Sequence, residues 1–144
     1  MPHNAETLKY ERLDKYPHMR PRDVEIWDKY IALNPEDFMS VRYDVKVGEP
    51  ELPGEDISDA VINDWRDLCR WGIDAVAEDE FAIYAIEVKP NATAGALGQA
   101  VAYAKLLEIK WKPKKPVIPA VVTDHISDIT AQAANAMGVE VWIP

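Results

Sequence analysis

The stretch that decides the fold is Trp71–Leu107, WGIDAVAEDEFAIYAIEVKPNATAGALGQAVAYAKLL. Two apolar segments, Ile73–Ala77 and Phe81–Val88, flank a short acidic turn, and each has the length and composition of a strand. The Ala- and Leu-rich segment Ala94–Lys110 follows and predicts the longest helix, which two prolines end soon afterwards. We therefore expect a hairpin of two strands that leads directly into a helix.

The rest of the chain alternates between helical and strand patterns. Apolar residues at helical spacing predict a helix over 22–33, and period-two alternation predicts a half-buried strand over 41–47. Residues 117–122 predict a strand with both faces covered, and Ser127 and Gly138 bracket a last helix before the final strand. The order predicts an α/β fold with a mixed sheet flanked by helices: a helix–strand–strand–strand–helix–strand core plus a C-terminal helix and strand.

A chain of 144 residues has the usual size of one domain, so we expect residues 1–144 to form a single domain. Residues 1–20 are expected to be an N-terminal arm, or a short helix over 5–15. Residues 48–70 are an acidic insert, in which a loop precedes a helix capped by Ser58 or Asp59. Four residues form the apolar face of that helix: Val61, Ile62, Trp65 and Leu68.

The formal net charge of −9 argues against tight, non-specific binding of nucleic acid by the chain as a whole. The charge is uneven, however, because 89–115 holds six basic residues and one acidic residue. These basic residues form either a solubilising surface or a rail for a phosphate backbone. The candidates for contact with nucleic acid are Lys105, Lys110, Lys112, Lys114 and Lys115.

No apolar run is long enough to cross a bilayer, and the first residues show no secretory signal. Cys69 is the only cysteine, which excludes an internal disulfide and a cysteine-ligated metal cluster. We therefore expect a cytoplasmic protein with no membrane partner.

The chemistry is expected where the two hairpin strands carry Asp74, Glu87 and Lys89. Side chains alternate along a strand, so Glu87 and Lys89 share one face. With an even-numbered turn, for example Asp79-Glu80, Asp74 lies on the same face opposite Ala85, with Glu87 as its diagonal neighbour. An odd-numbered turn would place the two carboxylates on opposite faces.

Two close carboxylates repel each other, and a divalent cation removes that repulsion. Hard oxygen ligands suit Mg²⁺, or Mn²⁺, with the remaining positions left to waters and phosphate oxygens. Asp74 and Glu87 are the expected ligands, together with the backbone carbonyl of Val88. The ammonium group of Lys89 would orient the attacking water or offset charge on the phosphate.

The order of an Asp, a hairpin, a Glu-x-Lys and a helix resembles the PD-(D/E)XK nuclease superfamily, whose restriction-endonuclease-like fold it implies. Gln99 and Tyr103 resemble the Gln…Tyr helix motif of the subgroup that contains recombination helicase–nucleases. The resemblance implies a metal-dependent nuclease acting on DNA, with Gln99 in the site and Tyr103 supporting it. It also implies an acidic residue on the first helix, for which Glu25 is the candidate and Asp28 its rival.

Other interpretations stay open at this point. A catalytically inactive member of the fold could serve as a DNA-binding or assembly subunit, and an unrelated α/β protein could bind a small anion. A homodimer or a larger nuclease or phage complex is possible, with the host cytoplasm as its location if the protein is phage-encoded. The acidic insert suggests a way to repel duplex DNA and to restrict the substrate to ends, flaps or single strands.

Overall fold

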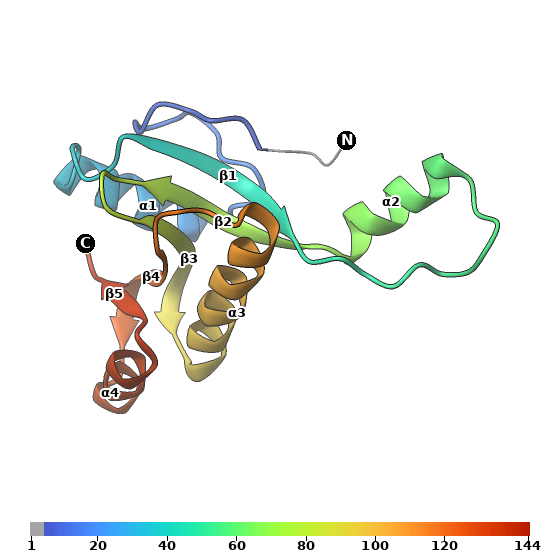
Figure 1. The fold of residues 1–144 in the computed structure, drawn as a ribbon. Helices are drawn as coiled ribbons and strands as arrows, with labels where there is room; N and C mark the ends of the chain where they lie inside the picture. Colours follow the sequence, from blue (N-terminus) through green and yellow to red (C-terminus); the bar gives the residue numbers. More distant parts are fainter. Residues whose placement is uncertain (1–4) are drawn as a thin grey trace.

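The computed structural model describes residues 5–144, and its arrangement is shown in Figure 1. The elements follow in the order α1 (Pro21–Leu33), β1 (Ser40–Val47), α2 (Asp59–Cys69), β2 (Trp71–Glu78), β3 (Ile83–Ala92), α3 (Ala94–Trp111), β4 (Val117–Ile126), α4 (Asp128–Met137) and β5 (Glu140–Trp142). This order confirms the predicted α/β class.

The five strands form one mixed sheet in the order β1-β2-β3-β4-β5. Neighbours are antiparallel from β1 to β3 and parallel from β3 to β5, as the strand–helix–strand units predict. Helix α1 covers one face through the fully buried Trp27, and α3 covers the other through Leu97 and Leu107. Helix α4 packs beside α3, so the sheet lies between two helical layers.

The turn between β2 and β3 fixes which side chains meet. Ala75 lies opposite Ile86 and Glu78 opposite Ile83, so four residues connect the two strands. The turn is longer than the two-residue example, because Asp79 Oδ1 accepts hydrogen bonds from the backbone N–H groups of Phe81 and Ala82 at 2.8 Å each. The expectation that Phe81 begins the strand is wrong, since its ring is 75% exposed in the turn. The turn is still even-numbered.

Strand β1 contributes side chains to both helical layers of the core. Val41 and Tyr43 of β1 pack with α1, whereas Val45 and Val47 pack with α3. The change occurs at Asp44, whose φ of 49° is left-handed and therefore unfavourable for a residue other than glycine. This distortion lies beside the position of Asp74 on β2.

The insert leaves the body of the protein as a projecting arm, which we define as residues 48–70 (Figure 1). The expectation that Val61 and Leu68 pack as an apolar face is wrong: their side chains are 50% and 81% exposed, and α2 buries none of its residues. The helix is held by its own cap, in which Ser58 Oγ accepts from the Val61 N–H at 3.4 Å. It is also held by Trp65, whose indole N–H donates to the Glu51 carbonyl at 2.7 Å.

The first segment lies against the sheet without forming the short helix considered for residues 5–15. Leu8 pairs with Val41 at the sheet edge, and its N–H donates to the Val41 carbonyl at 2.8 Å. Tyr10 and Tyr16 are buried, so this segment completes the α1 layer of the core. Residues 1–4 of the predicted arm lie outside the described residues. Across residues 5–144, none of the helices has the length and apolar character needed to cross a membrane.

Candidate active site

The hairpin brings Asp74 of β2 and Glu87 of β3 together. Because Ala75 pairs with Ile86, continuation of the same register places Asp74 directly across from Glu87 rather than across from Ala85. Two cross-strand neighbours at such a position have Cβ atoms roughly 5 Å apart. The backbone N–H of Val88 donates to Asp74 Oδ2 at 2.9 Å, which fixes that carboxylate against β3.

Both carboxyl groups are in an environment that disfavours their charge. Glu87 is only 4% exposed, and burial together with the nearby Asp74 raises its pKa to about 7. Burial raises the pKa of Asp74 to about 6, against the opposing hydrogen bond from Val88. Near neutral pH the pair therefore holds less negative charge than two free carboxylates unless a cation compensates it.

Lys89 supplies one positive group at this position. Its Nζ lies 3.3 Å from Glu87 Oε1, whereas the buried Glu87 Oε2 has no hydrogen-bond partner within residues 5–144. A buried carboxylate oxygen without a partner, beside a second carboxylate, supplies part of the oxygen donor set that a divalent cation requires. The described part of the chain offers no group of three or more His, Cys, Asp or Glu side chains for a metal. Water, a phosphate oxygen or the Val88 carbonyl would have to complete the coordination.

Tyr103 of α3 belongs to the same neighbourhood. Its side chain is 8% exposed, and burial, followed by the charges of Glu87 and Asp74, raises the pKa of its hydroxyl to about 12. Gln99 is exposed one turn earlier on α3, on the same face by its spacing of four residues. Its role in the site stays a prediction.

The acidic residue of α1 whose charge reaches the pair is Asp23. Asp23 raises the pKa of both Asp74 and Glu87, and it lies in the first turn of α1. Glu25 is exposed on the same helix, and its supporting role stays a prediction. Its rival Asp28 has a structural task, because Asp28 accepts from the Tyr16 hydroxyl at 2.6 Å.

Asp44 is a carboxylate that the sequence analysis did not include. It lies beside Asp74 on the other neighbouring strand and raises the pKa of Asp74. His18 Nε2 is 3.0 Å from one of its carboxylate oxygens, and Lys46 Nζ is 3.1 Å from the other. Gly72 makes room for this carboxylate, since a Cβ there would collide with it. Period-two alternation gave no signal for Asp44, because the pattern assigns it to an ordinary solvated face.

The predicted lysine rail divides into residues with different partners. Lys115 Nζ lies 2.9 Å from Glu78 and donates to the Asp79 carbonyl, near the start of β3. Lys89 is six residues further along β3, which is about 20 Å away along an extended strand. Lys105 pairs with Glu108 at 3.9 Å. Lys112 and Lys114 are exposed, and Lys110 lines a pocket between α2 and α3. Contact of these lysines with DNA stays a prediction.

With this geometry, the protein can be compared with known ones. No family model matches the sequence, and no curated protein matches it. Three solved structures are similar. A protein of unknown function, AF1548, has a TM-score of 0.52 and 18% identity over 78% of this chain. A repair endonuclease from Pyrococcus abyssi has a TM-score of 0.51 and 14% identity over 92% of this chain. A complex of EndoMS with double-stranded DNA has a TM-score of 0.50 and 14% identity, also over 92%.

At this level of identity the comparison shows a shared fold. The chain is similar in fold to structures that include a repair endonuclease, which confirms the predicted endonuclease-like architecture. The matches span 53% of the AF1548 chain and 49% of each of the other two, so the similarity covers about half the length of those proteins. What the other halves contribute to the activity of those proteins does not transfer to this chain.

Proposed function

We propose that this protein is a metal-dependent nuclease that hydrolyses phosphodiester bonds of DNA. The observation that carries the proposal is the buried pair of Asp74 and Glu87, with Lys89 Nζ 3.3 Å from one Glu87 oxygen and the other oxygen without a partner. A purely structural carboxylate pair would be costly at this depth, because each charge loses its hydration and repels the other. The fold shared with a repair endonuclease supports the same assignment.

The residues that would hold Mg²⁺ or Mn²⁺ are Asp74, Glu87 and the carbonyl of Val88. When bound, the ion would supply Lewis-acid polarisation of a phosphate oxygen and a lower pKa for a water molecule. The Val88 N–H keeps Asp74 oriented toward β3 throughout. Protonation competes with cation binding at both carboxyl groups, since their pKa values are raised to about 6 and 7.

In hydrolysis, a water oxygen bonds to phosphorus, one P–O bond of the backbone breaks, and the leaving oxygen gains a proton. Lys89 is placed to orient that water and to offset the negative charge that develops on the phosphate. Tyr103, with its raised pKa, stays protonated at neutral pH and can donate a hydrogen bond to the substrate backbone. The side-chain amide of Gln99, one turn before Tyr103 on α3, would contact the same DNA backbone.

The decisive experiment is cleavage of end-labelled single-stranded, duplex, flap and circular DNA with Mg²⁺, Mn²⁺ or EDTA. Asp74→Asn and Glu87→Gln should each reduce the rate by about a thousandfold or more, since essential groups acting as one unit lose nearly all activity singly. The matched control is Asp14→Asn in the exposed segment before α1, which should cut at the wild-type rate.

Two outcomes would contradict the proposal: cutting that survives in both site variants, or no cutting together with no Mn²⁺ binding by calorimetry. The second outcome would favour a non-catalytic DNA-binding or assembly subunit, and the net charge of −9 agrees better with assembly than with DNA binding.

A further inference from the structure

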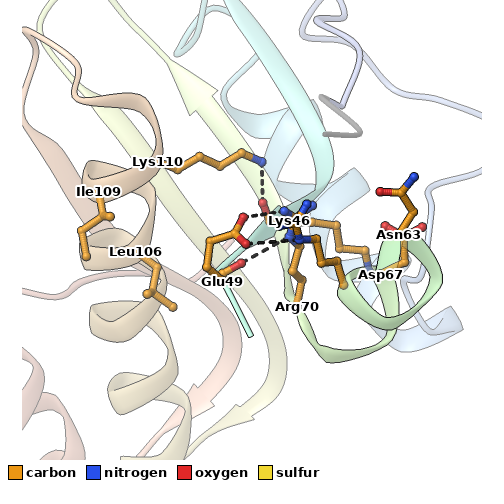
Figure 2. A pocket seen from close by; sticks show the side chains of 10 residues that line it. Lys46, Glu49, Asn63, Asp67, Arg70, Leu106, Ile109 and Lys110 are labelled. Atoms are coloured by element: carbon orange, nitrogen blue, oxygen red, sulfur yellow. Dashed lines mark hydrogen bonds and ion pairs between the residues drawn. The ribbon is translucent and has the colours of Figure 1, made fainter. Parts of the chain in front are cut away.

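A pocket lies outside the carboxylate site, at the root of the arm. Its volume is about 630 Å³, and it lies between α2, the end of β1 and the last turns of α3. Figure 2 shows Leu106, Ile109 and Lys110 entering from α3, with Glu49 and Arg70 in the middle of the view. The sequence motif for the nuclease site uses none of these residues.

The charged groups of the pocket are mostly cationic. Four basic residues and two acidic residues line it: Lys46, Arg66, Arg70, Lys110, Glu49 and Asp67. The side chain of Arg70 is nine-tenths buried and is anchored by the Gly48 carbonyl at 3.2 Å. Lys110 Nζ donates to the Lys46 carbonyl at 2.6 Å, and burial together with the charge of Arg70 lowers the pKa of Lys110. Such a cluster favours an anionic ligand.

Glu49 occupies this cluster as an internal counter-ion. Its carboxylate lies 2.6 Å from Arg70 Nη2 and 3.5 Å from Arg66 Nε, while its own side chain is 67% exposed. An exposed carboxylate that is held by two guanidinium groups can move aside without burying a charge. A phosphate group could then take the place of the Glu49 carboxylate between the two arginines.

The remaining walls suit a base rather than a small ion. Leu106 and the 69% exposed Ile109 provide an apolar side to the pocket. Trp71 does not line the pocket itself, but it follows the lining residue Arg70 directly, is 53% exposed, and meets Tyr103 edge-on with ring centroids 6.1 Å apart. An exposed aromatic ring beside a cationic groove is the arrangement on which single-stranded nucleic acids stack.

One stripe of α3 runs from the pocket toward the carboxylates. Tyr103, Leu106 and Lys110 follow one another on α3 at spacings of three and four residues, so they form one stripe of the helix. Tyr103 is at the carboxylate end of this stripe, because the charges of Glu87 and Asp74 act on it. Leu106 and Lys110 are at the pocket end.

We propose that the pocket at the root of the arm binds a single-stranded segment of DNA, with a base on Trp71 and a backbone phosphate between Arg66 and Arg70. This inference rests on the proposed nuclease function, because it assigns the bound strand to the same substrate. Stacking on Trp71 requires an unpaired base, and the acidic arm repels the two strands of a duplex more strongly than one strand, so the pocket favours single-stranded DNA. The substrate is therefore DNA with a single-stranded end or flap.

The test is fluorescence anisotropy with a labelled oligothymidylate of about 15 nucleotides in EDTA, where no cleavage occurs. Trp71→Ala and Arg66→Ala should each weaken binding by about tenfold. Phe81→Ala is the matched control, since Phe81 is an even more exposed aromatic residue in the β2–β3 turn, and the affinity of this variant should equal that of the wild type. Glu49→Gln should act in the opposite direction and tighten binding several-fold, because it frees two guanidinium groups.

The competition arm uses an unlabelled duplex of matching length, which should displace the oligothymidylate at least about tenfold less well. Equal affinities of all four variants, or weaker binding by Glu49→Gln in a variant that melts at the wild-type temperature, would overturn the inference. The experiment also separates failure of the pocket proposal from failure of the nuclease proposal. Binding that follows the predicted order without any cutting would overturn the nuclease function alone, and cutting with unaltered binding would overturn the pocket alone.

Discussion

The sheet centre and the arm are built from the same kinds of residues but obey different constraints. At the centre, Ile73, Ala75 and Ile86 are fully buried around Asp74 and Glu87. In the arm, apolar residues of α2 such as Leu68 stay exposed, and the helix buries none of its side chains. The centre therefore fixes its two carboxylates between packed strands, whereas the arm is held by a few polar contacts at its root. The two carboxylates are thus held in fixed positions at the centre, whereas the arm presents exposed side chains to the solvent.

The largest expected effect is on chemistry at the centre. Lys89→Ala should reduce DNA hydrolysis by about 100- to 1000-fold, because it removes the positive group nearest to Glu87. Lys29→Ala, an exposed lysine of α1, is the control and should leave the rate unchanged. Single-turnover rates at saturating DNA measure the step itself. A loss confined to DNA affinity would show that Lys89 binds substrate and does not act on the reacting phosphate.

The packing contrast predicts that alanine substitutions at two leucines have very different effects on the free energy of unfolding. Leu97→Ala should lower the free energy of unfolding by about 2–5 kcal/mol, because Leu97 is completely buried between α3 and the sheet. Leu68→Ala in the arm should change it by less than about 0.5 kcal/mol, because that side chain is 81% exposed. Urea unfolding of both variants gives the two values. Equal losses would mean that α2 packs against the body more closely than its exposure shows.

The buried pair predicts a pH dependence of stability in metal-free protein. The folded-state pKa of Glu87 is raised from 4.5 to about 7, so the folded state binds a proton more tightly than the unfolded state. Its contribution is fully present below about pH 4.5 and is lost as the pH rises to about 7. Glu87→Gln should remove this loss, so the variant gains on the order of 2 kcal/mol over wild type between pH 5 and pH 8. Urea titrations in EDTA at the two pH values test this, and parallel changes in both proteins would contradict it.

The smallest effect on stability, relative to the size of the change, is expected from removing the arm. Replacing residues 50–68 by a short Gly-Ser turn should change the free energy of unfolding by less than about 1 kcal/mol, since no buried side chain is lost and the ends of β1 and β2 already pair. The same protein should lose affinity for single-stranded DNA while it still binds Mn²⁺. Unfolding of this variant would show that the arm stabilises the hairpin that carries Asp74.

Much of this organisation could be predicted from residue patterns. The strand alternation over 41–47, the hairpin of Ile73–Ala77 and Phe81–Val88, and the helix from Ala94 follow from local periodicity, which reports the burial of each face directly. The prediction that Asp74 and Glu87 share a face depended on an even number of residues in the turn, which the structure has. Their exact pairing did not, because Asp79 lengthens the turn through hydrogen bonds from two backbone N–H groups.

The sequence by itself determined the class of the fold and predicted a site at Asp74, Glu87 and Lys89, because alternation along two neighbouring strands is a local property. Only the tertiary structure decided that Asp44 lies beside this pair, that Asp23 is the acid of α1 whose charge reaches it, and that the arm leaves the body. The physical reason is that local and long-range interactions decide different features. Side-chain direction is set by each residue and its neighbours, whereas the approach of β1, α1 and the arm to the site depends on sheet twist and on packing between distant parts of the chain.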